Sequence, residues 1–316
     1  MRAVLLCSAV LGLMVPNAAQ ADEVVLEPSS KWVLDYHPDR CRLVRTFGTG
    51  NNKHFFQLEQ SRPSSVLSWL VAGPIIKHLP NRREVEVRFG PSFGSMSVRK
   101  DPDLTLGEFG PVLSGADYQP FVQDSIVVTD AGLVKNKEEA TASSDAPTLR
   151  SAEPVSAEPR FSLAVEDGKQ INSFTITNGK RDQVTFVLGN MGSAFKAMND
   201  CADDLVRSWG LDPAVLRTQT TNPQWTNMPA LARMIQQRYP SAALARGEQA
   251  NFQLRVMVGT DGRPTSCAFV ELTKAENFSD RVCPIIMSEA TFVPATDSSG
   301  RPIPSFHQSR ILYRMP

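Results

Sequence analysis

The chain has 316 residues, of which 33 are basic and 33 are acidic, so its formal net charge is zero at pH 7. A neutral chain without a long basic run is poorly suited to nucleic acid or to anionic lipid as its main partner. The length suggests about two domains.

Residues 1–21 have the layout of a secretory signal peptide. A positive charge at Arg2 precedes an apolar run over residues 3–15, and small residues lead to Ala21, so we expect cleavage before Asp22. The run is shorter than the roughly 20 residues of a membrane-spanning helix. The sequence therefore predicts export to the periplasm, with an uncleaved segment anchored in the inner membrane as the alternative.

Four cysteines follow the predicted cleavage site. They are Cys41, Cys201, Cys267 and Cys283. In an exported protein an even number of cysteines indicates disulfides, and the division into two early and two late residues predicts one bridge in each domain. No CxxC spacing and no nearby pair of histidines accompanies them, so metal binding is the weaker interpretation and we predict no cofactor.

The pattern over residues 22–210 predicts a β-rich domain. Val85, Val87 and Phe89 alternate with charged residues, which indicates a sheet with one buried face. Residues 166–169, Glu-Asp-Gly-Lys, have the composition of a hairpin turn. The expected strands cover residues 32–36, 41–47, 54–60, 66–72, 85–89, 161–165, 171–176 and 183–188.

A helix over residues 193–209 is expected to close this domain. Ser193 is placed to cap its N-terminus, and Gly210 is placed to end it in a left-handed conformation. Cys201 lies beside an apolar stripe of the helix, so a bridge to Cys41 would join the first strands to the last helix. The stripe consists of Phe195, Met198, Ala202, Leu205 and Trp209.

Two polar segments interrupt the pattern. Residues 136–160 are rich in Lys, Glu, Ala, Thr, Ser and Pro and contain almost no large apolar residues, so we expect an exposed, mobile excursion. Residues 211–227 contain Pro213, Pro223 and several Thr and Asn residues, which predicts a linker between the two domains.

The last segment, residues 228–316, has the element order of a small α+β domain. Apolar residues alternate over residues 250–258, a turn that ends in Asp-Gly-Arg follows, and a second strand is expected at residues 265–272. An apolar-periodic segment around residues 282–287 predicts a helix, and residues 306–313 form the expected final strand. Two strands, a helix and a strand make one α+β layer.

Short motifs occupy fixed places in this segment. They are Tyr239-Pro240 before the first strand, Asp261-Gly262-Arg263 in the hairpin, Phe292, Pro294 and Ala295 after the helix, and Gly300-Arg301-Pro302 before the last strand. In this combination the segment resembles the TonB C-terminal domain, and Cys267 and Cys283 match a two-cysteine variant of it. The segment departs from that pattern at Ala250, at residues 272–275 and at Pro284, which predicts a helix that begins late or is kinked.

The resemblance implies how a partner would bind. In TonB C-terminal domains the final strand lies at the edge of the sheet and accepts an extended peptide of an outer-membrane transporter. The residues of this expected edge are His307, Ser309, Ile311 and Tyr313. An unpaired strand edge also offers N–H and C=O groups for such addition. The alternative is that the β-rich domain covers the edge, or that Arg310, Arg314 and Pro316 blunt it.

Patterns that would indicate catalysis are weak. Residues 90–94 match GxSxG around Ser92, but the alternation of residues 95–99 predicts a hairpin rather than the strand-to-helix elbow of a hydrolase. The histidines are scattered and are expected at the surface. They are His37, His54, His78 and His307.

The sequence therefore favours binding over catalysis. The leading hypothesis is a non-catalytic periplasmic interaction module that engages another envelope protein through a TonB-like fold. A membrane-anchored, TonB-like energy transducer for outer-membrane transport is the second hypothesis, and the chain lacks the long Pro-rich spacer that TonB uses. A periplasmic hydrolase with its site in the β-rich domain is the third.

Overall fold

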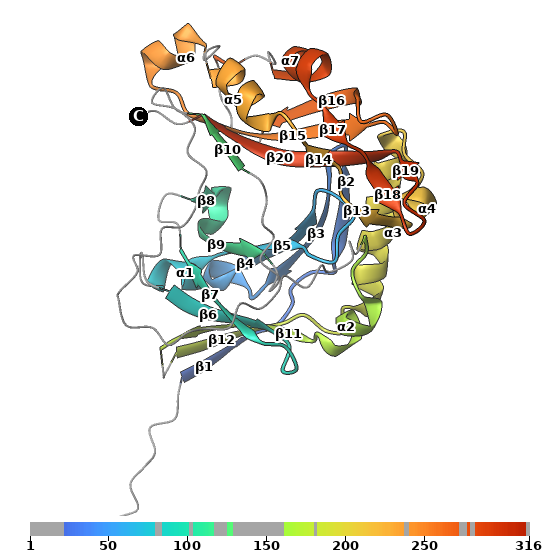
Figure 1. Cartoon of the computed structure of the whole chain (residues 1–316). Coiled ribbons are helices and arrows are strands. Elements are labelled where there is room, and N and C mark those ends of the chain that lie inside the picture. The colour runs from blue at the N-terminus through green and yellow to red at the C-terminus, as the bar shows by residue number, and fades with distance from the viewer. Residues whose placement is uncertain are drawn as a thin grey trace, which may run out of the picture.

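The computed structural model describes residues 22–79, 84–100, 104–116, 125–128, 161–179, 182–236, 240–271, 277–278 and 282–313. The predicted signal peptide and the predicted excursion over residues 136–160 lie outside this part of the chain. No helix among the described residues is long and apolar enough to cross a membrane. The fold is α+β, as predicted, and its C-terminal strands and helices stack above a β-rich N-terminal part (Figure 1).

A six-stranded antiparallel sheet forms one layer of the N-terminal part, with the strand order β2-β3-β4-β5-β9-β8. Side chains of its strand β4 alternate, because Phe56 and Leu58 point into the core while Phe55 and Gln57 lie on a half-buried outer face. The strands are β2 (Val33–His37), β3 (Arg40–Phe47), β4 (His54–Gln60), β5 (Ser68–Ala72), β8 (Thr105–Leu106) and β9 (Gly110–Ala116). The short helices η1 (Gly50–Asn52) and η2 (Gly107–Phe109) connect strands of this sheet, and α1 (Pro74–His78) follows β5 and precedes β6 of the second sheet.

A five-stranded sheet, with the order β1-β12-β11-β6-β7, forms the second layer. Its first strand, which the sequence did not predict, pairs parallel with β12, and the remaining pairs are antiparallel. The strands are β1 (Asp22–Leu26), β6 (Glu84–Phe89), β7 (Ser95–Arg99), β11 (Ser173–Asn178) and β12 (Asp182–Val187).

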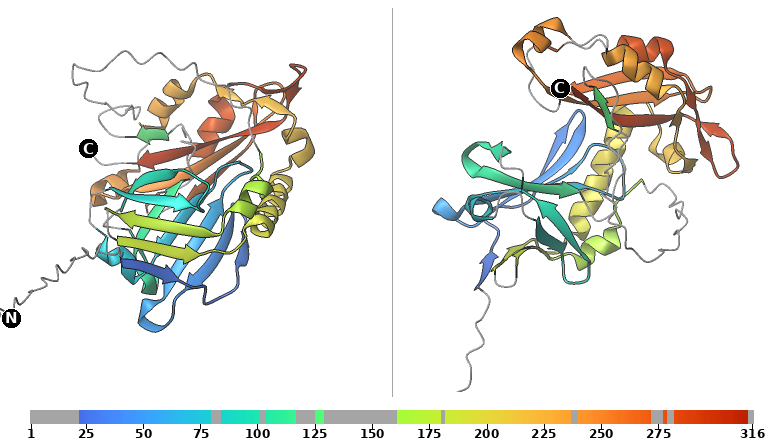
Figure 2. Two further views of the ribbon diagram at one scale, coloured as in Figure 1. Left: turned by 90° about the horizontal axis from the view of Figure 1, so that it is seen from below. Right: turned by 60° about the vertical axis from the view of Figure 1, so that its left-hand side comes forward.

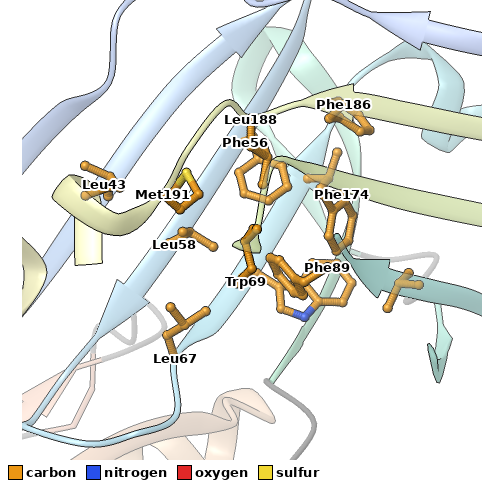
Figure 3. Close-up of a cluster of buried hydrophobic side chains, with 14 of the residues drawn as sticks. Leu43, Phe56, Leu58, Leu67, Trp69, Phe89, Phe174, Phe186, Leu188 and Met191 are labelled. Atoms are coloured by element: carbon orange, nitrogen blue, oxygen red, sulfur yellow. The ribbon is translucent and has the colours of Figure 1, made fainter. Parts of the chain in front are cut away.

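Aromatic side chains fill the space between these two sheets (Figure 3). The ring of Phe56 meets that of Phe174 edge-on, with the ring centroids 5.1 Å apart. The ring centroids of Trp69 and Phe174 lie 4.8 Å apart. Such aromatic pairs add about 0.5–1.5 kcal/mol beyond the burial of their area. The N-terminal part therefore has a hydrophobic core of its own.

Helix α3 (Gly192–Ser208) packs on this core and is joined to it covalently. Cys201 on α3 is bonded to Cys41 on β3, which confirms the predicted first disulfide. Gly210 has a φ of 83° and ends the helix as predicted, with its N–H donating to the carbonyl of Arg207. The predicted cap at Ser193 is wrong, because the helix begins one residue earlier.

The sequence prediction also fails at residues 161–170. Residues 161–164 form no strand, and helix α2 (Val165–Gln170) takes the place of the hairpin turn predicted at residues 166–169. The N–H of Gly168 donates to the carbonyl of Ala164 at 3.1 Å, which is a helical bond. A Cβ atom on Gly168 would lie 2.9 Å from the ring of Phe195, so the glycine allows close contact between α2 and α3.

The segment predicted as a linker has secondary structure of its own. It contains α4 (Pro213–Leu216), β13 (Gln219–Thr221) and β14 (Gln224–Trp225). The strand β13 pairs with β18 (Ala295–Asp297), and β14 pairs with β17 (Phe292–Val293). This segment is therefore packed along the C-terminal strands.

The C-terminal part contains the predicted hairpin, helix and final strand, together with two further helices. The right-hand view of Figure 2 shows that it stacks on the N-terminal part. The predicted elements are β15 (Ala250–Val258), β16 (Pro264–Glu271), α7 (Val282–Glu289) and β20 (Ser305–Tyr313). The further elements are α5 (Met228–Gln236), α6 (Ser241–Arg246), β19 (Pro302–Ile303) and a strand from earlier in the chain, β10 (Ser125–Val128).

Candidate functional site

The candidate site is the C-terminal sheet, in which the strand order is β10-β20-β15-β16. The strand β15 lies inside the sheet and pairs antiparallel with β20 on one side, from Ala250 opposite Tyr313 to Val258 opposite Ser305. It pairs antiparallel with β16 on the other side. The sheet thus has two outer strands, β10 and β16.

One face of this sheet carries the core of the C-terminal part. Leu254 and Val256 on β15 are fully buried and pack with side chains of α5 and α7, among them Leu231 and Ile286. The ring of Phe252 stacks on that of Phe269 of β16, with the centroids 4.1 Å apart. The alternation that predicts β15 therefore directs its apolar residues toward the helices.

A disulfide fixes α7 to this face. Cys267 on β16 is bonded to Cys283 on α7, as predicted, so the N-terminal part and the C-terminal sheet each hold one bridge. Pro284 lies in the first turn of the described helix and is exposed, where a proline is tolerated because its missing N–H would have no partner within the helix. The helix then continues to Glu289.

The Asp-Gly-Arg turn between β15 and β16 requires its glycine. Gly262 has a φ of 76°, and a Cβ atom on it would lie 2.1 Å from the backbone oxygen of Phe292. Its carbonyl accepts a hydrogen bond from the N–H of Phe292 at 2.9 Å. The turn is thereby held against the chain that follows α7.

The Gly300-Arg301-Pro302 motif forms a second fixed turn, between β18 and β19. The carboxylate of Asp297 accepts hydrogen bonds from the hydroxyl of Ser299 at 2.6 Å and from the guanidinium of Arg301 at 2.9 and 3.1 Å. The bond from Ser299 and those from Arg301 outweigh burial and lower the pKa of Asp297 to about 2. Both motifs thus form turns that are held in place by hydrogen bonds.

The other face of the sheet is covered by the N-terminal part. Arg255 on β15 is only 8% exposed, and its guanidinium lies 4.1 Å from the ring centroid of Trp209, at the end of α3. It also lies 3.5 Å from the carboxylate of Asp39, in the turn between β2 and β3. Burial lowers the pKa of Arg255, although the neighbouring Asp39 acts in the opposite direction.

Apolar and polar contacts extend this interface along β20. The ring of Phe306 meets that of Trp209 edge-on, with the centroids 5.3 Å apart. The side-chain amide of Gln308 donates to the carbonyl of Ser61, between β4 and β5, at 3.4 Å. Together with Met257, Phe306 belongs to a small hydrophobic cluster that includes Val206 of α3. The face opposite the helices is therefore not free to bind a partner.

Most side chains of the predicted binding edge on β20 lie in the interior of the structure. Ser309, Ile311 and Tyr313 are buried, with exposed fractions of 0, 0 and 5%, because odd-numbered positions of β20 face the helices. His307 is half-buried, 5.5 Å from the ring of Trp225. The backbone of Arg310 to Tyr313, moreover, pairs in parallel with β10. These side chains therefore belong to the core, and the predicted edge is occupied at its C-terminal end.

The outer edge of β16 differs from that of β20. Within the described residues no strand pairs with this side of β16. Thr265 and Ser266 are exposed there, and Phe269 is half-buried. Pro264, at the start of the strand, has no N–H to offer. Among the described residues this edge of β16 is therefore unpaired with any other strand.

The structure shows the surroundings of the residues considered for catalysis. Ser92 lies between β6 and β7, which form the predicted hairpin, so no nucleophile elbow is present. The prediction of surface histidines is wrong for His54, which is fully buried, accepts from the N–H of Ile75 and contacts the carbonyl of Asn52. Among the described residues no three His, Cys, Asp or Glu side chains cluster as a metal site would require.

Comparison with known proteins finds a similar family for one part of the chain. No curated protein matches the chain. Residues 235–315 match the family model described as the Gram-negative bacterial TonB protein C-terminal. The matched residues include β15, β16, α7 and β20, and they leave the β-rich N-terminal part without an assignment. The C-terminal part of this chain is therefore similar to the C-terminal domain of TonB proteins, as its motifs predict.

Proposed function

We propose that this protein is an exported, non-catalytic interaction protein of the Gram-negative envelope. Its C-terminal sheet would bind an extended segment of another envelope protein by adding a strand, and an outer-membrane transporter is the partner class that the family suggests. The observation that carries this proposal is the match of residues 235–315 to the TonB C-terminal family, on a segment folded as the motifs predict.

The arrangement of the sheet supports strand addition over other modes of binding. One face packs on α5 and α7, and the other packs on the N-terminal part, so neither face offers a broad surface. A sheet covered on both faces can still bind through its edges, where unpaired N–H and C=O groups give affinity and flanking side chains give specificity. The edges of β16 and β20 are therefore the surfaces to test.

A second candidate is a membrane-anchored energy transducer, which the same family match favours. It differs from the first in one respect, since residues 1–21 would then stay attached and hold the protein in the inner membrane. Fractionation of cells followed by N-terminal sequencing separates the two. A chain that begins at Asp22 and is released with the periplasm supports the exported interaction protein, and a chain that retains residues 1–21 in the membrane supports the transducer.

Photo-crosslinking in living cells tests the proposed function. A crosslinking amino acid replaces exposed residues at two places in the C-terminal part, Ser266 on β16 and Leu244 on α6, which is 44% exposed. The matched control carries it at Tyr36 on β2 in the N-terminal part, which is 59% exposed. We expect adducts with an envelope protein from one or both C-terminal positions and none from Tyr36. Adducts from Tyr36 alone, or from no position, would contradict the proposal.

A further inference from the structure

The strand β10 is an outlier in the topology. It comes from the N-terminal half of the chain, yet it joins the C-terminal sheet, and among the described residues it pairs with β20 only. Its residues Ser125 to Val128 run parallel to Arg310 to Tyr313. Helix α5 lies against it (Figure 1). A segment of the same chain therefore lies on the outer edge of β20, beside helix α5.

Backbone pairing explains why a segment is held there. Since β15 satisfies one side of β20 along all nine of its residues, the N–H and C=O groups on the other side need a second partner. The four residues of β10, Ser-Ile-Val-Val, provide one and are uncharged and mostly β-branched, a composition that favours strands. The edge at Arg310 to Tyr313 is thus paired with a short parallel strand from the same chain.

We propose that β10 is an internal occupant of the partner site, and that a partner segment binds by displacing it. This inference rests on the proposed function and commits it to one edge. The incoming segment would have the composition of β10, which is uncharged and rich in β-branched residues. It would be extended and would run parallel to β20, as β10 does.

The pairing of β10 has the features of an exchangeable strand. It is four residues long, whereas the pairing of β15 with β20 is nine residues long. Parallel pairing is also slightly less stable per residue than antiparallel pairing. Short peripheral elements open at a lower free energy than the core strands of a fold. Only molecules in which β10 has left the edge can bind another strand. The apparent affinity of the edge is therefore the intrinsic affinity multiplied by the fraction of molecules in which the edge is open.

A labelled peptide tests this competition directly. The probe carries Ser-Ile-Val-Val between flanking glycines, and fluorescence anisotropy measures its dissociation constant with the full mature chain. In the variant Val127→Pro the proline disfavours pairing of β10, while the control Val127→Thr keeps the N–H and a β-branched side chain. We expect Val127→Pro to bind the peptide at least tenfold more tightly than the parent and the control. Equal affinities, or no binding to Val127→Pro, would overturn the proposal.

Hydrogen exchange gives a second readout that needs no ligand. In Val127→Pro the amides of Arg310 to Tyr313 that point toward β10 should exchange at least tenfold faster, while the amides that join β15 to β16 should not change. A double variant, Ile126→Gly with Val127→Gly, makes the same comparison should the proline variant fail to fold. Unchanged exchange at residues 310–313 in a folded variant would show that β10 does not protect this edge, which would overturn the proposal.

The outcomes also separate this inference from the proposed function. If the peptide binds Val127→Pro tightly but no envelope protein is crosslinked to the C-terminal part, the acceptor site stands and the proposed function fails. If an envelope protein is crosslinked equally to the parent and to Val127→Pro, and the peptide does not compete with it, the proposed function stands and the partner uses another surface, such as the outer edge of β16. That result would overturn the displacement of β10.

Discussion

Replacing Arg255 tests how the C-terminal sheet is held on the N-terminal part. The guanidinium is buried between Trp209 and Asp39, and burial is the larger influence on its pKa. Keeping a charge in such a place costs free energy that its pairing only partly offsets. Replacement of a whole buried ion pair by apolar side chains of similar volume is often neutral, whereas removal of one partner is costly to the extent that the charge left behind stays buried.

The surroundings of Arg255 determine how much stability each of three variants should lose. Arg255→Met retains a long side chain against Trp209 and leaves Asp39, whose side chain is 23% exposed, with access to water, so we expect a loss of less than about 1 kcal/mol. Arg255→Ala also removes the packing of the stem and should cost about 2 kcal/mol. Asp39→Ala leaves the guanidinium of Arg255 buried without its partner carboxylate. We expect this to lower the free energy of unfolding by about 2 kcal/mol, below the usual range for a buried pair because this pair is partly solvated.

Equilibrium urea unfolding with the disulfides intact, followed by circular dichroism, measures these differences. The expected order of stability places the parent and Arg255→Met together, above Arg255→Ala and Asp39→Ala. If Arg255→Met lost as much stability as Arg255→Ala, the charge itself would be stabilising, and our reasoning on desolvation would be refuted.

The remaining predictions concern the turns, the second disulfide and one buried histidine. Replacing Cys267 and Cys283 by alanine should lower the free energy of unfolding by up to about 3 kcal/mol, the loop-closure value for a sequence separation of 16, and an unchanged urea midpoint would contradict this. Gly262→Ala should cost about 2–4 kcal/mol because of its left-handed backbone and the contact with the chain after α7, whereas Gly300→Ala, with nothing within 4 Å of the new Cβ, should cost about 1 kcal/mol. Equal losses in thermal unfolding would exclude the steric explanation. Burial lowers the pKa of His54 below its ordinary 6.5, so the folded state holds the neutral ring, and the stability this gives is present above about pH 6.5 and is lost as the pH falls. The parent should therefore lose more stability than His54→Gln between about pH 7.5 and pH 5.5, and equal losses would contradict the assignment.

Local patterns were sufficient where one face of an element is buried. The strand over residues 250–258 is predicted with its observed bounds, because Leu254 and Val256 alternate with residues of the opposite face. Cys201 and Cys283 were paired correctly, since each lies on a helix that packs over the strand that carries its partner. Periodicity and cysteine spacing are short-range signals, and here they agree with the tertiary structure.

Prediction failed where contacts between distant segments decide the structure. Asp167-Gly168 has the composition of a turn, but Gly168 packs against Phe195 and lies in a helix. Arg255 alternates with Leu254 and Val256 along β15, and its burial comes from Trp209 and Asp39, which are distant in the sequence. The occupation of β20 by β10 depends on a pairing across more than half of the chain, which no local pattern of residues contains.

We propose that the C-terminal sheet binds an envelope protein through a strand edge. Hydrogen exchange of the mature chain, measured with and without detergent-solubilised outer membranes, tests it most directly because it reports on the backbone of every described element at once. We predict slower exchange at an edge of the C-terminal sheet, at β20 or β16, and unchanged exchange in the six-stranded sheet of the N-terminal part. Protection confined to β2 to β5, or absent throughout the chain, would contradict the claim.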